Sequence, residues 1–333
     1  MREFSTHKAV TESGWRSPGP IVALTSLRGY LALWVVLFHY RHDVVRLCPS
    51  TMVLLPLMQW GHMAVPAFFM LSGFVLAYNY ADRFPRLGRP EVIRFLCLRL
   101  ARIYPVHLFT LLVVAAMVWV SGRVGYPLTD MPYTARNFVL NLFLVQTWTP
   151  NFTMDWNYPS WSISSEWFAY LIFPLAVIGI LRHLTTPLRA TFAGGTALAS
   201  AIAVMVWGPW PLYELVLVVP TFLAGATIYW ILRGRLTTED SRLWRWLPEA
   251  LVLLVGASCF LFLPAFTVAS LLCCFLGLIL VLAWLGPYCH LPWSARPAVF
   301  LGDISYSLYL THMLAYKWSS DLCPLLASNR QDC

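Results

Sequence analysis

The chain has 333 residues, of which 59% are apolar and only 11% are charged, whereas a soluble globular domain carries about 25% charged residues. This composition argues against a soluble enzyme, and the formal net charge of +8 argues for membrane topology rather than nucleic-acid binding, because it comes mostly from arginines in loops between apolar runs. We expect one all-α domain, a polytopic transmembrane helix bundle of about nine to ten membrane-spanning helices, at residues 21–318, between a cytoplasmic N-terminal segment (1–20) and a short C-terminal tail (319–333).

Nine apolar runs are predicted to cross a hydrocarbon core of about 30 Å, at a helical rise of about 1.5 Å per residue. They cover residues 21–40, 60–81, 103–121, 159–181, 191–207, 212–232, 248–264, 266–285 and 298–318. The apolar segment 137–148 is short for a crossing, and we expect it to lie in the interface or to re-enter the membrane.

The arginines between the runs predict the orientation, because short cytoplasmic loops carry an excess of Lys and Arg. The loops after the second, fourth and sixth crossings are arginine-rich and fall on one side, together with Lys8 and Arg16. The opposite side has the long, tryptophan-rich stretch 124–158. The pattern predicts a multi-pass protein of the bacterial cytoplasmic membrane with its N-terminus in the cytoplasm.

The first crossing, IVALTSLRGYLALWVVLFHY, contains two ionisable residues, Arg28 and His39. Their spacing of eleven residues is about three helical turns, so both side chains project from one face of the helix. Ionisable side chains inside a membrane usually face a cavity or a partner, which makes both residues functional candidates. The alternative is that each side chain extends to the nearer interface.

Two further candidates come from the second and third crossings. Ser72 lies in the string FFMLSGF, where a Ser-Gly pair fits either a site or close helix packing. Arg99 and Arg102 share one face at the start of the third crossing, a position suited to binding phosphate oxygens. Their alternative role is that of an ordinary positively charged cytoplasmic flank.

The fourth and last crossings also carry polar residues. Glu166 lies near the start of the fourth, beside four serines, and a carboxylate inside a membrane needs a function. By the predicted topology it shares the external half of the membrane with His39, which allows a carboxylate–imidazole pair. In the last crossing Ser305, Tyr309 and His312 form a stripe on one helix face, and this indicates hydrogen bonding between helices or a catalytic role.

These segments together resemble the membrane acyltransferase family 3, a group of bacterial and animal integral-membrane O-acyltransferases. Four matching strings occur in the family's order: LTSLRGYLALWVVLFHY, AVPAFFMLSGFVL with RFLCLRLARIYP, PSWSISSEWFAYLIFP, and GDISYSLYLTH. The resemblance implies that the family's site residues are its first-helix pair, its cytoplasmic R-x-x-R motif and its tryptophan–serine–glutamate segment. In this chain these would be Arg28 and His39, Arg99 and Arg102, and Glu166.

The resemblance predicts transfer of an acyl group, most simply acetyl, from cytoplasmic acyl-CoA to a hydroxyl of a carbohydrate, a lipid-linked molecule or a small molecule. His39 would be the general base, because an imidazole titrates near neutrality. Glu166 would hold the His39 tautomer or stabilise the imidazolium. Arg28 would bind donor groups or offset the charge of a developing oxyanion.

The donor side of the predicted site is cationic. Arg99 and Arg102 would bind the phosphates of CoA, with Ser72 also on the donor side. No metal is expected, because the eight cysteines form no C-x-x-C motif.

Two alternatives to this function remain. A proton-coupled transporter would use Arg28, His39 and Glu166 as a proton relay, but the sequence has no inverted repeat and no matched pair of broken helices. A catalytically impaired, truncated family member is the other alternative, because the family usually has about ten helices while this chain turns polar at Lys317.

Overall fold

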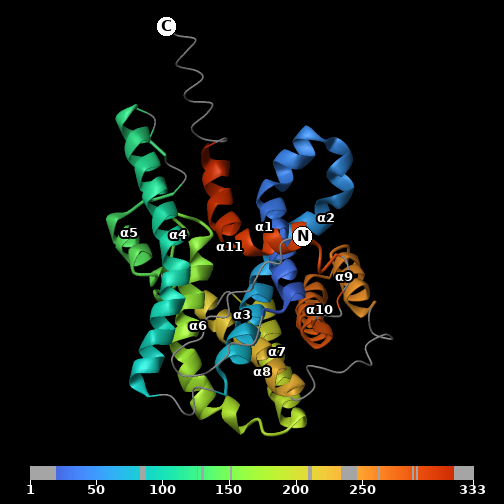
Figure 1. The fold of residues 1–333 in the computed structure, drawn as a ribbon. Helices are drawn as coiled ribbons and strands as arrows, with labels where there is room; N and C mark the ends of the chain where they lie inside the picture. Colours follow the sequence, from blue (N-terminus) through green and yellow to red (C-terminus); the bar gives the residue numbers. More distant parts are fainter. Residues whose placement is uncertain are drawn as a thin grey trace, which may run out of the picture.

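A computed structural model describes residues 20–82, 88–125, 127–128, 131–150, 152–208, 212–233, 246–261, 263–286, 289 and 292–318. Within these ranges every regular element is a helix, so the all-α prediction is confirmed. The helices form one bundle (Figure 1). Except for Pro20, the predicted N-terminal segment lies outside the described residues, as does the tail 319–333.

The helices have the following bounds. They are α1 (Val22–Leu47), η1 (Pro49–Leu54), α2 (Leu55–Gln59), η2 (Trp60–Met63), α3 (Ala64–Tyr80), α4 (Arg89–Arg123), α5 (Ala135–Leu142), η4 (Gln146–Trp148), α6 (Ser160–Gly179), η5 (Leu181–His183), α7 (Pro187–Trp207), α8 (Tyr213–Leu232), α9 (Leu247–Ser258), α10 (Pro264–Leu285) and α11 (Arg296–Lys317), where η marks a 3₁₀ turn.

Each of the nine predicted crossings overlaps a helix, although α9 covers only the first part of the crossing predicted at 248–264. Among the described residues, seven helical stretches are long and apolar enough to cross a membrane: α1, η1 to α3, α4, α6 with η5, α7, α8 and α10. The other two are α9, which has only 12 residues, and α11, which has 22 residues but carries the polar stripe of the last crossing. The chain is therefore a multi-pass helical membrane protein.

Several predicted boundaries differ from the structure, among them those of α4 and of the segment 137–148. α4 has 35 residues and begins at Arg89 rather than near residue 103. Its first turns consist of the arginine-rich sequence that was expected to lie in a loop. The segment 137–148 forms α5 and η4, where Thr147 is fully buried and its hydroxyl lies 2.9 Å from that of Ser164 on α6. The segment is therefore packed against α6.

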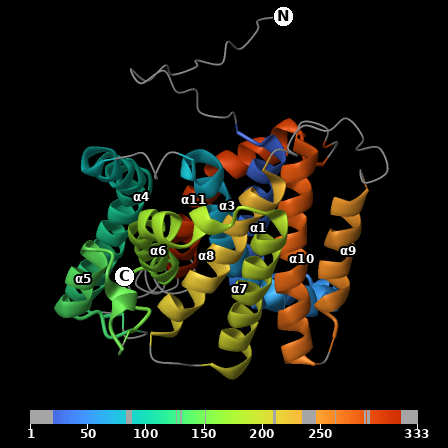
Figure 2. The same cartoon turned by 90° about the horizontal axis from the view of Figure 1, so that it is seen from below.

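Two helix pairs make the closest approaches in the bundle. α1 packs along α11, where Gly29 lies against Gly302, and α3 packs along α8, where Gly73 lies against the Phe222 backbone and Gly225 against the Met70 backbone. A Cβ atom on Gly302 would overlap the carbonyl oxygen of α1 residue Thr25. Figures 1 and 2 show α4 and α5 at one edge of the bundle and α9 at the opposite edge, with α3 between them.

Large apolar side chains lie on both the inside and the outside of the bundle. Phe69, Phe74 and Phe222 are buried at the contact of α3 with α8. On the outer surface, Leu175 of α6 is 71% exposed and Phe192 of α7 is 75% exposed. Apolar side chains are expected on the outside where a helix faces lipid. Only the backbone polar groups of such a helix need hydrogen-bond partners, and they find them within the helix.

Candidate active site

Three neighbouring cavities lie inside the bundle, and each is named here by a residue or its position. The Tyr80 cavity has a volume of about 320 Å³, the central cavity about 120 Å³ and the His39 cavity about 550 Å³. The Tyr80 and central cavities share Arg28, Arg99 and Arg102 in their walls. The central and His39 cavities share Val65 and Tyr309.

The cavities follow one another along the helix axes. On α1, Leu24 lines the Tyr80 cavity, Arg28 lines the central cavity and His39 lines the third. At a rise of about 1.5 Å per residue, the eleven residues from Arg28 to His39 span about 16 Å. The antiparallel helix α3 passes the same cavities in the opposite order. The site is therefore a row of three adjacent cavities along the bundle, a path of cavities with an arginine end and a histidine end.

The arginine end holds three positive charges that form no ion pair within the described residues, although Glu166 and Asp303 line the central cavity with them. Arg99 donates a hydrogen bond of 2.9 Å to the Tyr80 hydroxyl, and its guanidinium lies over the Tyr80 ring. Arg28 donates a long hydrogen bond of 3.4 Å to the Thr25 hydroxyl. In the described parts of the chain none of Arg28, Arg99 and Arg102 has a carboxylate within ion-pair distance. Unpaired cations in a membrane protein are costly, so an anionic ligand is the expected partner.

Glu166 and Ser72 face each other in the central cavity. The Ser72 hydroxyl donates a short hydrogen bond to Oε1 of Glu166, and the Tyr170 hydroxyl donates one of 2.6 Å to the same oxygen. This corrects the prediction that Glu166 orients His39. Six residues, about 9 Å of helical rise, separate Glu166 from the start of α6 at Ser160, so its carboxylate lies deeper than the histidine end.

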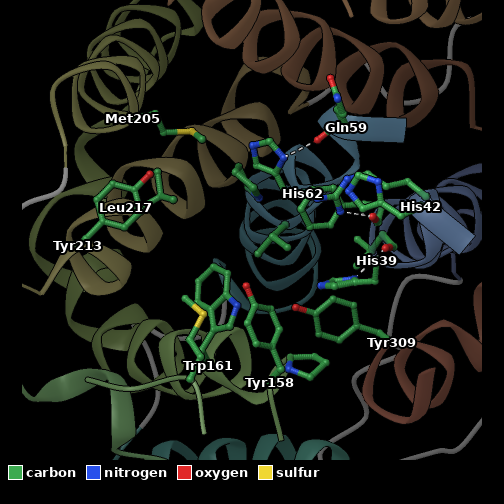
Figure 3. A pocket seen from close by; sticks show the side chains of 17 residues that line it. His39, His42, Gln59, His62, Tyr158, Trp161, Met205, Tyr213, Leu217 and Tyr309 are labelled. Atoms are coloured by element: carbon green, nitrogen blue, oxygen red, sulfur yellow. Dashed lines mark hydrogen bonds between the residues drawn. The ribbon is translucent and has the colours of Figure 1, made fainter. Parts of the chain in front are cut away.

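His39 lines the large cavity at the other end of the path. Figure 3 shows His39 and His62 on one side of this cavity, Tyr158 and Trp161 on another, and Met205, Tyr213 and Leu217 on a third. Most of the lining side chains are aromatic or aliphatic, with a few polar groups among them. Such a mixture is typical of a small-molecule site.

The His39 imidazole has one nitrogen engaged and one without a partner. Its Nδ1 lies 2.9 Å from the carbonyl oxygen of Val35 and 3.1 Å from Nε2 of His312. Its Nε2 is buried and has no hydrogen-bond partner among the described residues. Asp43, one turn further along α1, instead pairs with Arg46 at 3.1 Å.

The polar stripe on α11 makes the contacts between helices that the sequence indicated. The Tyr309 hydroxyl lies 2.8 Å from the Ser162 hydroxyl of α6, and His312 contacts His39 of α1. Ser305 differs, because it bonds the Gly302 carbonyl of its own helix. The sequence placed His312 on the polar face of its own helix. It did not identify His39, on another helix, as the partner of His312.

A buried polar network surrounds the start of α6. The Ser160 hydroxyl donates to the Asn141 side chain at 3.0 Å, and the Asn157 amide donates to the Thr110 hydroxyl at 2.9 Å. Burial raises the pKa of the Asp155 carboxyl in this loop. These residues were not singled out from the sequence, because each is a common loop or helix residue until the chain is folded. Across the described ranges, no group of three or more His, Cys, Asp or Glu side chains is arranged to hold a metal ion.

Comparisons with known proteins identify the family of the chain. A model of the family 3 acyltransferase domain matches residues 21–330. Acyltransferase MdmB of Streptomyces mycarofaciens is 35% identical over 156 residues, which are 46% of this chain and 38% of that protein. The match therefore spans well under half of MdmB. No solved structure matches the chain. The family match covers nearly the whole chain, including every helix of the site, and the chain belongs to the membrane acyltransferase family 3.

Proposed function

We propose that the protein is an O-acyltransferase that moves an acyl group, most simply acetyl, from acyl-CoA to a hydroxyl of a carbohydrate or small-molecule acceptor, including a lipid-linked one. One observation carries the proposal: unpaired arginines and a histidine with an unpartnered nitrogen lie at opposite ends of one path of cavities. Family membership supports acyl transfer in general.

The arginine end suits the donor. CoA carries several phosphate groups, and a guanidinium offers planar, charge-assisted donors that match phosphate oxygens. Arg99 and Arg102 line the Tyr80 cavity, and Arg28 lies where this cavity meets the central one. With the phosphates at the arginines, the narrow arm and its thioester would extend through the central cavity toward Val65 and Tyr309. Arg99 and Arg102 would then be on the cytoplasmic side, where acyl-CoA is made, with the N-terminus on that side.

The histidine end suits the acceptor. Nε2 of His39 would accept the proton of the acceptor hydroxyl while the oxygen attacks the thioester carbon, and the proton would leave with CoA as its thiol. The axial distance of about 16 Å favours donor binding by Arg28 over charge stabilisation at the carbon attacked near His39. In this arrangement Glu166 and Ser72 line the passage of the donor arm rather than hold the base.

Purified protein in lipid nanodiscs tests the proposal. With acetyl-CoA and a mixture of hydroxyl acceptors, we expect release of free CoA and formation of an equal amount of acetyl ester. The His39→Gln variant serves as the control for non-enzymatic hydrolysis. Absence of both acetyl-CoA binding and CoA release would contradict the proposal. Proton-driven uptake of a solute by proteoliposomes, without ester formation, would favour a transporter.

A further inference from the structure

The side chain that meets the His39 imidazole is a second imidazole. Nε2 of His312 lies 3.1 Å from Nδ1 of His39, and the ring centroids are 4.9 Å apart. His312 is only 5% exposed, and the Tyr40 hydroxyl donates a bond of 2.9 Å to its backbone carbonyl. The second ring is therefore held firmly in place against the first.

Backbone carbonyls determine which nitrogens of the pair carry protons. A carbonyl oxygen only accepts hydrogen bonds, so a ring nitrogen that contacts one must be an N–H. Nδ1 of His312 lies 2.7 Å from the Tyr309 carbonyl oxygen, and Nδ1 of His39 lies 2.9 Å from that of Val35. Both Nδ1 atoms are thus protonated, and a neutral imidazole then has a lone pair on Nε2.

This placement makes the contact between the rings a donor–acceptor pair. The N–H on Nδ1 of His39 lies between two acceptors, the Val35 carbonyl and Nε2 of His312. In the other tautomer, Nδ1 of His39 would carry a lone pair instead of a proton. It could then donate no hydrogen bond to the Val35 carbonyl or to Nε2 of His312. A proton on Nε2 of His312 would likewise face the N–H of His39. The pair therefore accepts one proton, at Nε2 of His39.

We infer that His312 is a positioning residue of His39, which together with the Val35 carbonyl holds the ring in the tautomer that leaves Nε2 unprotonated. The inference rests on the proposed acyl transfer, because it gives the unpartnered nitrogen its task. Among the described residues no carboxylate contacts the His39 ring, since Asp43 pairs with Arg46 and Glu166 with Ser72. The base is thus oriented by a neutral partner and not by a charged one.

If this is correct, a glutamine at position 312 and a glutamine at position 39 should have opposite effects on kcat. In His312→Gln the amide oxygen still reaches the His39 N–H, whereas His312→Ala leaves it with the Val35 carbonyl alone. We expect His312→Ala to lower kcat by about 10²-fold, the cost of a misoriented catalytic group, with the KM for acetyl-CoA unchanged. His312→Gln should retain most of kcat. At position 39, Gln should be as poor as Ala, because an amide cannot act as a base.

The matched control is His183, which lies exposed in η5, away from the three cavities. His183→Ala and His183→Gln should both leave kcat unchanged. Activity is expressed per folded molecule, measured by gel filtration, so that a purely structural role for His312 appears as a loss of folded protein at normal kcat. Equally low kcat in the Ala and Gln variants at position 312, with normal folded protein, would contradict the inference.

A second readout does not depend on turnover. In protein labelled with ¹⁵N-histidine, the His39 signals, identified by their loss in His39→Gln, should report a protonated Nδ1 and an unprotonated Nε2. His312→Ala, which leaves the Val35 carbonyl as the single acceptor of the Nδ1 proton, should add a population of the other tautomer. An unchanged tautomer in His312→Ala would overturn the inference. A wild-type protein without acyl transfer would contradict the proposed function, while the same spectra would still decide the tautomer.

Discussion

At the scale of single residues, the ionisable side chains singled out from the sequence line the cavities. Arg28, Arg99, Arg102 and Glu166 line the central cavity together with Ser72, and His39 lines the next one. Ionisable groups survive inside a membrane protein only where a cavity, a partner or a ligand compensates them. Their identity was therefore readable from the sequence before their contacts were known.

His39 gives the sharpest prediction at this scale. As the general base, His39→Ala should cut turnover by about 10²–10⁴-fold while the protein still inserts and binds acyl-CoA. His39→Gln keeps an amide of similar size but accepts no proton, so it should be nearly as poor. Specific activity per folded molecule measures both variants. Near-normal turnover with Gln would mean that the residue only makes hydrogen bonds between helices.

The arginine pair is predicted to act on donor binding rather than on chemistry. Replacing both Arg99 and Arg102 by Ala should raise the KM for acyl-CoA at least about tenfold, because each charge-assisted contact contributes about 1.5–3 kcal/mol. The control is the double replacement of the exposed Arg182 and Arg189, which lie outside the three cavities. Equal KM values for the two double variants would leave Arg99 and Arg102 as topology signals only.

At the scale of helices, glycine contacts set the shape of the path. α1 and α11 carry His39 and His312, and the two helices approach closely because Gly29 and Gly302 lie at their contact. The α3–α8 contact brings two backbones together in the same way through Gly73 and Gly225. Small residues at such contacts are how membrane helices pack without a hydrophobic driving force.

A single methyl group at this contact tests the packing. Gly302→Ala should lower the midpoint of thermal unfolding, because its Cβ would overlap the Thr25 carbonyl and overpacking costs about 1–3 kcal/mol. The control is Gly195→Ala on α7, where a Cβ would meet nothing within 4 Å. It should leave the midpoint unchanged or raise it, since Ala favours a helix by about 1 kcal/mol over Gly. A stable Gly302→Ala variant would show that the two helices can separate freely.

The passage between the central and His39 cavities is a second test of a helix position. Val65 of α3 lines both cavities, so Val65→Trp should close the passage. We expect acyl-CoA binding to persist while kcat falls, because the arginines remain accessible and the thioester no longer reaches His39. Val65→Ala, which widens the passage, should keep the activity. Full turnover in a folded Trp variant would mean that the acyl group takes another route.

At the scale of the whole molecule, the orientation in the membrane decides whether the site can meet its donor. Reporter fusions after Arg94 and Arg235 should report the cytoplasm, and fusions near Asn151 should report the outside, because the arginine-rich loops are retained inside. An external signal at Arg94 would place Arg99 and Arg102 away from the cytoplasmic pool of CoA and contradict donor binding there. Arg235 and Asn151 lie outside the described residues, so the fusions also extend the topology beyond them.

The sequence by itself determined the all-α membrane bundle and the candidate residues of the site. A crossing depends only on a local run of apolar residues and on the lipid around it, so the seven helical stretches long and apolar enough to cross a membrane were all recognised without knowledge of their neighbours. An ionisable residue within such a run is conspicuous for the same local reason. The four family strings were local too, and they named the family that the comparison over residues 21–330 supports.

Only the tertiary structure decided which of these residues meet. His39 and His312 are 273 positions apart, and the depth of a side chain along its helix depends on where that helix begins and how it packs. For that reason the expected pair of His39 with Glu166 was wrong: the carboxylate bonds Ser72 and Tyr170 in the central cavity, and His312 takes the place beside the imidazole. Contacts between helices are non-local, and a residue pattern within one helix does not contain them.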